Sequence, residues 1–425
     1  MHESTIHAAY AAARDALAQQ GINTEAALAA LEATTLSLPC WQGDDVTGLE
    51  ADASGASGGI AATGNYPGRA RNGDELRADL ALALSLVPGR NKISLHASYA
   101  ENTGKRDRDA YDAGDFSRWI DWAKAQNIGL DFNPTFFSHR LAQDTTLSSP
   151  DEGVRRFWIA HGIASRNITA AMAKALGMPC VNNLWIPDGM KDDTPNRLAY
   201  RQRLAASLDA VYAKPYDNGA QAVDAVESKL FGLGSEAYVV GSHEFYMGYA
   251  QSVTARGVPV IPTLDLGHFH PTEQIADKIS AMLLFHPSLL LHISRGVRWD
   301  SDHVAVFSDD LVRVMREIHR ADAAGRVYFG LDFFDASINR IAALVIGARA
   351  VQRARLASLL EPVAALRDAE ARGDYAARLA AIDACATSPV AAVYDEYCLR
   401  SGKAPGIAWL ADVAAYERDV QSKRG

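Results

Sequence analysis

Cysteine is scarce in this sequence of 425 residues, and the four that occur are Cys40, Cys180, Cys385 and Cys398. No two of them form a Cys-x-x-Cys pair, which argues against a zinc ribbon, and a chain of this length needs no disulfide framework. No apolar run approaches the length of a membrane span. The first twenty residues lack a continuous apolar core, so no signal peptide is expected. We therefore predict a cytoplasmic protein with no membrane partner.

Basic charge is also in short supply. The chain has 42 Lys and Arg against 51 Asp and Glu, a formal net charge of −9, and its basic residues are scattered. This distribution excludes a nucleic-acid partner. A hydrophobic content of 48% and a charged content of 22% are ordinary for a soluble enzyme. The length suits one large α/β domain with extensions, or two or three smaller domains.

Several catalytic motifs are missing. The chain has no P-loop and no His-Glu-x-x-His sequence, and its one Gly-x-Ser-x-Gly match, GASGG (55–59), does not lie between a candidate strand and a helix as a nucleophile elbow does. The glycine-rich run GASGGIAATG (55–64) does not sit between a strand and a helix as a dinucleotide-binding turn does. An enzyme acting on phosphates or using a nicotinamide cofactor is therefore not expected.

What the sequence does contain is an alternation of short β-rich runs and longer helical runs. Candidate strands occupy residues 36–41, 93–97, 128–133, 180–186, 222–228, 260–266, 289–294 and 327–333. Helical patterns include residues 74–87, 115–127, 152–177 and 272–284. The alternation predicts a parallel sheet, and eight units predict a (β/α)₈ TIM barrel, although an open doubly wound sheet has a similar pattern.

Polar residues at the ends of these runs favour the barrel. Almost every candidate strand carries, at or just past its C-terminal end, a side chain able to bind metal or substrate: Trp41, Gln42, His96, Asp131, Asn133, Trp185, Glu227, Lys229, Asp265, His268, His292 and Asp332. In a barrel all of these would surround one mouth, where active sites lie, whereas an open sheet would spread them along an edge.

Extensions flank the predicted barrel. We expect a single catalytic domain over residues 1–425, with an N-terminal helix, a barrel from about 34 to 338 and a C-terminal helical extension from about 339 to 425. The extension either wraps the barrel or packs against another subunit. The Gly-, Ala- and Ser-rich stretch 50–72 is too long for an ordinary connection, so it is either a lid over the mouth or a surface loop.

Five of the mouth candidates are carboxylates, namely Glu227, Asp265, Asp300, Asp302 and Asp332. Two unit charges about 4 Å apart repel by about 4 kcal/mol at an effective dielectric of about 20. A shared pocket therefore requires protonation or cations, and two divalent ions together with Lys229 would supply the charge. Oxygen and imidazole donors without thiolate suit Mn²⁺, with Co²⁺, Mg²⁺ or Zn²⁺ as alternatives.

Each candidate also has a structural interpretation. The Asp300-x-Asp302 pair fits a solvated turn, His292 fits a buried histidine with one hydrogen bond, and Glu227 with Lys229 fits an internal ion pair. Asp332 or Asp335 could cap the following helix. His270 could be a ligand, a support for a ligand or a buried histidine. The recurrence of such residues at consecutive strand ends favours the functional interpretation.

Long segments of the chain resemble the enterobacterial-type L-rhamnose isomerase family. The matching segments include CWQGDDVTG (40–48), IGLDFNP (128–134), NLWIPDGMKD (183–192), DAVESKLFG (224–232), DLGHFHPTE (265–273), VRWDSDHV (297–304) and GLDFFDASINRIAA (330–343). The resemblance runs from about residue 38 to the C-terminus. It departs at the N-terminal helix and at residues 99–109 and 251–263, which hold none of the proposed ligands.

This resemblance implies a cytoplasmic homotetramer that interconverts L-rhamnose and L-rhamnulose with Mn²⁺. It implies that one metal is held by Glu227, Asp265, His292 and Asp332, and a second by His268, Asp300 and Asp302, with Asp265 close to both. It also assigns the catalytic roles to Asp300, Asp302, His268 and Lys229, and the contacts to the sugar to His96, Trp185, Lys229 and Asp332.

The expected mechanism is a metal-assisted hydride shift between C1 and C2, with a side-chain base and an enediol as the rival. Another metal-dependent sugar isomerase or epimerase on the same barrel is the alternative enzyme. A sugar- or metal-binding protein without catalytic activity is the alternative from another class. The intact set of ligands, together with Lys229, argues against this last possibility.

Overall fold

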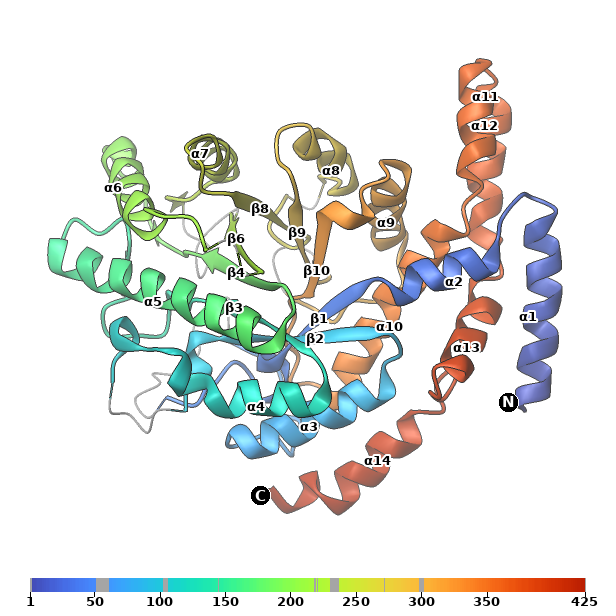
Figure 1. Cartoon of the computed structure of the whole chain (residues 1–425), viewed down its shortest axis with the longest axis horizontal. Coiled ribbons are helices and arrows are strands. Elements are labelled where there is room, and N and C mark those ends of the chain that lie inside the picture. Colours follow the sequence, from blue (N-terminus) through green and yellow to red (C-terminus); the bar gives the residue numbers. More distant parts are fainter. Residues whose placement is uncertain are drawn as a thin grey trace.

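The structure is a computed structural model that describes residues 2–50, 61–101, 106–143, 145–217, 219, 221–229, 237–270, 272–297 and 302–424. Its centre is a closed barrel in which every neighbouring pair of strands is parallel (Figure 1). In order around the barrel the strands are β1 (Thr35–Pro39), β2 (Arg90–His96), β3 (Gly129–Asn133), β4 (Cys180–Trp185), β6 (Ala222–Glu227), β8 (Val260–Asp265), β9 (Leu289–Ile293) and β10 (Val327–Leu331). The predicted TIM barrel is thus confirmed.

A helix follows each barrel strand and covers the outside of the barrel. These helices are α3 (Gly73–Leu86), α4 (Ser117–Gln126), α5 (Glu152–Leu176), α6 (Arg197–Val211), α7 (His243–Ala255), α8 (Ala276–Leu283), α9 (Asp309–Arg320) and α10 (Arg340–Leu359). Side chains accept hydrogen bonds from backbone N–H groups at several of their starts, for example Asp151 at α5 and Ser308 at α9. Because α10 packs against α9 and α3, it completes the last βα unit, and the helical extension proper begins after it.

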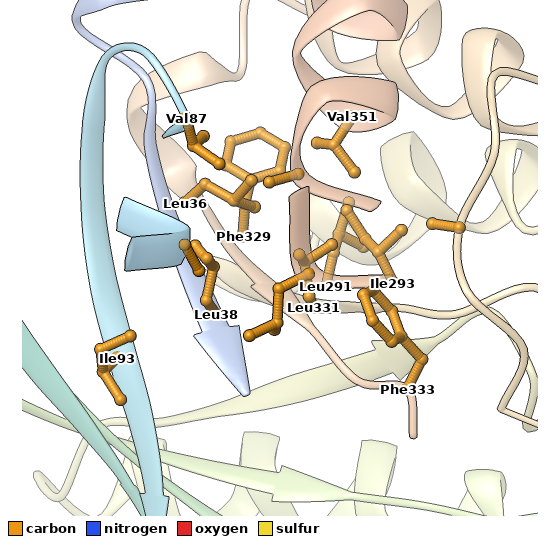
Figure 2. Packing of buried hydrophobic residues seen from close by; sticks show 14 of the residues in the cluster. Leu36, Leu38, Val87, Ile93, Leu291, Ile293, Phe329, Leu331, Phe333 and Val351 are labelled. Carbon is orange, nitrogen blue, oxygen red and sulfur yellow. The ribbon is translucent and has the colours of Figure 1, made fainter. Parts of the chain in front are cut away.

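The two faces of the barrel strands pack differently because successive side chains of a strand point to opposite sides. Outward-facing residues such as Leu36, Leu291 and Leu331 pack against α10, where Val351 meets them (Figure 2). Inside the barrel, strands β4, β6, β8 and β9 contribute a small apolar layer to the lumen. It is formed by Val181, Ala225, Ile261 and Leu290, with Val223 and Tyr328 packed against them.

The two ends of the chain pack together beside the barrel. At the N-terminal end lie α1 (Glu3–Ala18) and α2 (Thr24–Glu32); at the C-terminal end lie α11 (Val363–Ala371), α12 (Tyr375–Ala384), α13 (Val390–Arg400) and α14 (Leu410–Asp419). Helices α1 and α13 lie side by side (Figure 1), where His7 Nδ1 is 2.7 Å from Glu396 Oε2. A short antiparallel ribbon, β5 (Gly189–Met190) with β7 (Tyr238–Val239), stands apart from the barrel.

One pair of helices in the extension has the length and apolar composition of a membrane span. Within the described residues no single helix does, and the pair, Tyr375–Thr387 with Val390–Arg400, is bent by 49°. Several side chains of its second helix, among them Val393, Tyr394 and Cys398, are buried in the protein.

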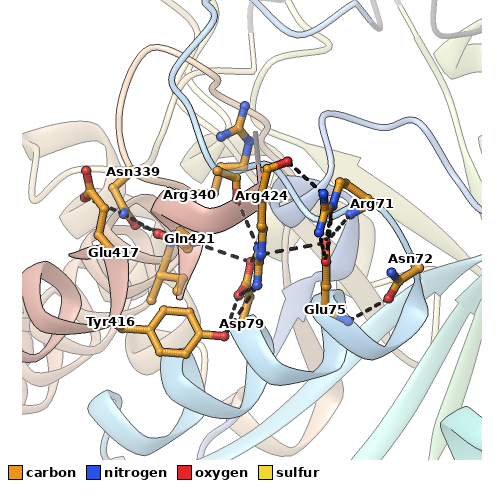
Figure 3. A network of polar contacts seen from close by, with 12 residues as sticks. Arg71, Asn72, Glu75, Asp79, Asn339, Arg340, Tyr416, Glu417, Gln421 and Arg424 are labelled. Carbon is orange, nitrogen blue, oxygen red and sulfur yellow. Dashed lines mark hydrogen bonds and ion pairs between the residues drawn. The ribbon is translucent and has the colours of Figure 1, made fainter. Parts of the chain in front are cut away.

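The last turn of the chain is anchored on α3 by a buried ion pair (Figure 3). Arg424 Nη1 and Nη2 lie 2.6 and 2.7 Å from the carboxylate oxygens of Asp79, and the Tyr416 hydroxyl donates to the same carboxylate at 2.9 Å. Arg424 also donates to the carbonyl of Gly68 at 3.0 Å. The C-terminal segment therefore supports the loop that leads into α3.

The described part of the predicted lid is fixed to its surroundings. Tyr66 N donates to the Ala336 carbonyl at 2.7 Å, and the Tyr66 hydroxyl donates to Glu417 at 2.9 Å. Arg340 donates to the Tyr66 carbonyl at 2.8 Å. Residues 61–72 thus form a wall that ties the loop after β1 to the loop after β10. Residues 51–60 of the predicted lid lie outside the described residues.

Candidate active site

Four potential metal ligands converge at the C-terminal ends of adjacent strands. Glu227 ends β6, Asp265 ends β8, His292 lies near the end of β9 and Asp332 follows β10. The register pairs Asp265 with His292 and His292 with Gly330, two residues before Asp332. Since side chains two residues apart share a face, all four point into the mouth. One donor atom from each lies within 4.8 Å of the others.

His292 is the centre of this cluster. Its Nδ1 atom lies 3.0 Å from Glu227 Oε2, 3.0 Å from Asp332 Oδ2 and 4.0 Å from Asp265 Oδ2. Although it is buried, Nδ1 has hydrogen-bond geometry with no atom of the described residues. A buried nitrogen aimed between carboxylates without a hydrogen bond is placed as a metal ligand would be.

The charges of the cluster also support a metal site. Burial lowers the pKa of His292, but the neighbouring Glu227 and Asp332 charges outweigh it and raise that pKa well above its usual value. Burial raises the pKa of Glu227, and His292 and His268 more than reverse this, so the pKa lies well below the usual range. The carboxylates thus demand positive charge, which either a proton on His292 or a cation can supply. The oxygen and imidazole donors fit a divalent ion.

His268 is oriented by the backbone. Its Nδ1 lies 2.9 Å from the Ser228 carbonyl and 3.1 Å from Glu227 Oε1, while its Nε2 lies 3.8 Å from Asp265 Oδ2. A proton on Nδ1, donated to that carbonyl, leaves the lone pair of Nε2 directed toward the cluster, an arrangement that metal-binding histidines commonly have. His268 thus presents Nε2 to the same cluster, and its role as a ligand of a second metal stays a prediction.

Asp302 also reaches the mouth. It is buried and lines the same cavity as His268 and Asp332, and its carbonyl accepts a hydrogen bond from Phe334 N at 3.3 Å. Its φ of 40° lies in the left-handed region, which aspartate tolerates better than most residues. Asp300, the other half of the predicted pair, lies outside the described residues, so the complete second ligand set stays a prediction.

Aromatic rings form the walls of the cavity. Trp185 packs against Phe137 with ring centroids 5.4 Å apart, and Lys229 Nζ lies 4.6 Å from the centroid of the Trp185 ring. His96 packs between Trp41 at 4.6 Å and Phe137 at 5.4 Å. Burial lowers the pKa of His96 to about 4, so its ring is neutral near pH 7. The four predicted sugar contacts, His96, Trp185, Lys229 and Asp332, all line this cavity.

The sequence prediction missed a chain of polar groups beneath the ligands. Asn183 Nδ2 donates to Glu227 Oε2 at 2.5 Å and to Asn133 Oδ1 at 3.3 Å. Thr263 Oγ1 donates to Asn183 Oδ1 at 2.7 Å, and Asn133 donates to Ser94 Oγ at 2.7 Å. Asn183 thus fixes the orientation of the Glu227 carboxylate. The available signal was an asparagine inside a buried strand, two residues before Trp185.

Two other strand-end candidates, Asp131 and Gln42, have structural roles. Asp131 lies 2.6 Å from Lys92 Nζ inside the barrel, away from the ligand cluster. The side-chain amide of Gln42 bonds both the N–H and the carbonyl of Asp335, which ties the loop after β1 to the loop after β10. His270 is exposed and its Nδ1 lies 2.7 Å from the Thr272 hydroxyl, so it is not a buried histidine.

The residue that caps the start of α10 is neither of the two aspartates, Asp332 and Asp335, predicted as candidates for this role. Asn339 accepts hydrogen bonds from the N–H groups of Ile341 and Ala342 at the start of α10. Asp332 is thereby left to the ligand cluster. The Asp335 carboxylate instead accepts bonds from the N–H and hydroxyl of Ser337.

Comparison with known proteins gives matches over almost the whole chain. A family model described as L-rhamnose isomerase (RhaA) matches residues 4–424. A protein of Rhodopirellula baltica named L-rhamnose isomerase is 52% identical over 420 residues, which are 99% of this chain and 97% of that protein. The L-rhamnose isomerase of Escherichia coli strain K12 is 53% identical over 418 residues, 98% of each chain.

Similar solved structures are more distant. An L-ribulose 3-epimerase has a TM-score of 0.45 at 16% identity, covering 76% of this chain and 96% of its own. A D-psicose 3-epimerase of Clostridium cellulolyticum H10 has a TM-score of 0.44 at 12% identity, with the same coverage of 76% and 96%. The full-length matches are therefore those to the curated relatives and to the family model, and by them this chain belongs to the L-rhamnose isomerase family.

Proposed function

We propose that the enzyme interconverts L-rhamnose and L-rhamnulose with two bound divalent cations, Mn²⁺ foremost, and that it works as a cytoplasmic homotetramer. The observation that supports this most directly is the cluster of Glu227, Asp265, His292 and Asp332 at the barrel mouth. Membership of the L-rhamnose isomerase family supplies the sugar. His268, Asp300 and Asp302 would hold the second cation.

The reaction moves one hydrogen from C2 to C1 and one proton from O2 to O1. We assign the carbon-to-carbon step to a hydride shift, because the cavity lining offers carboxylates and imidazoles that face one another rather than one isolated base. Bound divalent cations would supply Lewis-acid polarisation of the sugar oxygens. The protein itself must hold the open-chain sugar so that C1 and C2 stay in a fixed geometry.

Individual residues then take separate roles. Trp185 offers a flat face to the apolar side of the sugar. Lys229 donates a charged hydrogen bond to a sugar oxygen, and its position over the Trp185 ring holds the ammonium beside the sugar. Neutral His96 offers a further hydrogen bond. Asp302, buried beside Asp332 and His268, is placed to act on the sugar hydroxyls together with the cluster.

Turnover of L-rhamnose in D₂O tests both the reaction and its mechanism. We expect L-rhamnulose to form with no deuterium at C1, because a hydride shift carries the substrate hydrogen across without exchange. Mass spectrometry of the ketose measures this. Substantial deuterium at C1 would contradict the hydride shift and favour the enediol route, while absence of any ketose from metal-loaded protein would contradict the proposed function.

The same turnover assay, run with different sugars, tests the assignment of L-rhamnose as the substrate. Values of kcat/KM for L-rhamnose, L-mannose, L-lyxose and D-allose are expected to be highest for L-rhamnose. A clear preference for another sugar would instead support a different metal-dependent isomerase or epimerase on the same barrel.

Replacement of His96 by Asn is expected to lower kcat/KM for L-rhamnose by about 5- to 150-fold, which corresponds to the loss of one hydrogen bond of about 1–3 kcal/mol. Because the pKa of His96 is about 4, its ring is neutral from pH 6 to pH 8, and the loss should be the same factor at pH 6, 7 and 8. The largely exposed His7 supplies the control, since His7→Asn should leave kcat/KM unchanged. A His96→Asn loss that varies tenfold over this range would refute a neutral role.

A further inference from the structure

The N-terminal end of the barrel, opposite the metal cluster, contains a second cavity. Its volume is about 1030 Å³. The starts of β1, β2 and β10, together with the residues before β3 and β4, form its walls, and Leu290 and Tyr328 of the apolar layer form part of its lining. A cavity of this size lies at the upper end of the range for small-molecule sites. Among the described residues, this cavity and the cavity at the mouth share no lining side chain.

This cavity is positively charged in a protein that is negatively charged overall. Its lining contains Arg90, Lys92, Arg355 and Lys403, but only one acid, Asp131. Lys92 is neutralised by Asp131, with 2.6 Å between Nζ and Oδ1. For the other three cations the described residues provide no ion pair. Three cations around one cavity are unusual for a chain whose formal net charge is −9.

Arg355 is the most informative of these cations. Its side chain comes from the last turns of α10 and is only 3% exposed. Within the part of the chain that the structure describes, its buried Nε atom has no hydrogen-bond partner and Nη1 donates to Ser358 Oγ alone, at 3.3 Å. Burial lowers the pKa of Arg355 to about 10, which leaves it charged at neutral pH. A buried guanidinium without an acid is costly, so a partner for it is missing.

We propose that this cavity binds a small phosphate-bearing anion, with Arg355 as its principal contact and Arg90 and Lys403 as supporting charges. The planar guanidinium matches the oxygens of a phosphate, which would satisfy donors that the chain leaves unused. Three cations from β2, α10 and the segment before α14 surround the space, which favours an anion with more than one charge. This site is separate from the site at which the sugar reacts.

Isothermal titration calorimetry of the Mn²⁺-loaded enzyme with inorganic phosphate tests the proposal. We expect a Kd below about 1 mM, at least tenfold weaker binding in Arg355→Met, and unchanged binding in Arg353→Met. Arg353 is a matched control because it lies two residues away on α10 and does not line the cavity. Glu227→Gln should retain phosphate binding, which separates this site from phosphate bound at the metal cluster.

A second measurement guards against a variant that merely misfolds. Without phosphate, Arg355→Met should have an equal or higher Tm than the parent, because it removes a buried unpaired charge. The titration is repeated with a hexose monophosphate and with citrate. If the sugar phosphate binds more tightly than inorganic phosphate, the natural ligand of the cavity is a phosphorylated metabolite. The proposal would be overturned if the enzyme did not bind phosphate, or if it bound citrate alone. It would also be overturned if Arg355→Met bound phosphate as tightly as the parent, or if Glu227→Gln lost phosphate binding.

Discussion

Glu227→Gln is expected to reduce kcat for L-rhamnose by at least about 100-fold. Mutation of a residue that only orients a metal ligand already lowers metal affinity or activity by about 10- to 100-fold, and Glu227 is a proposed ligand itself. The replacement keeps the shape of the side chain but removes the charge that lies 3.0 Å from His292 Nδ1 and 3.1 Å from His268 Nδ1. The amount of Mn²⁺ bound per subunit should also fall, and elemental analysis after gel filtration measures it. Ketose formation from L-rhamnose provides the rate.

Removal and return of the metal complete this experiment. Protein stripped with a chelator should lose activity, and added Mn²⁺ should restore it in the parent but not in Glu227→Gln. Glu370→Gln serves as a matched control, because Glu370 is largely exposed on α11 and pairs with Arg378 on α12, far from the ligand cluster in the sequence. A Glu227→Gln enzyme with normal metal content and normal turnover would show that the cluster is not the metal site.

The second large effect is on stability. Arg424→Met is expected to lower the free energy of unfolding by about 3–5 kcal/mol, the usual cost of removing one partner of a buried ion pair. Asp79 is 1% exposed and would keep only its contacts with Tyr416 and Gln421. Urea unfolding followed by circular dichroism measures the change.

The double variant Asp79→Asn with Arg424→Met separates a buried charge from lost packing. Removing both charges should recover part of the stability, because no carboxylate is then left unpaired. Arg418→Met is the control on the neighbouring helix, since Arg418 is exposed and pairs with the exposed Asp419. A double variant as unstable as Arg424→Met alone would mean that the buried charge is not what matters.

Much of the barrel was predictable because its signals are local. Each strand is a short apolar run bounded by polar residues. The side chain at the end of the strand is polar, although a core position would normally hold an apolar residue. The boundary between barrel and extension was not predictable in the same way. Residues from Arg340 onward have one continuous helical composition, and only the packing of α10 against α3 and α9 assigns it to the barrel.

The site was predictable where a residue ends a strand and not where its role depends on a partner far along the chain. Glu227, Asp265, His292 and Asp332 were candidates because of their positions, the family resemblance selected them as one ligand set, and the structure brings them together. Asp131 resembles them in sequence, yet Lys92 on the neighbouring strand neutralises it. The role of Asn183 depends on its hydrogen bonds to Asn133 and Glu227, which periodicity cannot reveal.

The apolar layer of Val181, Ala225, Ile261 and Leu290 lies one inward-facing position before Asn183, Glu227, Thr263 and His292 on the same four strands. The side chains directly beneath Glu227 and His292 are therefore hydrocarbon. A cation at the cluster would draw its oxygen and nitrogen ligands from the strand ends and from the side of the mouth.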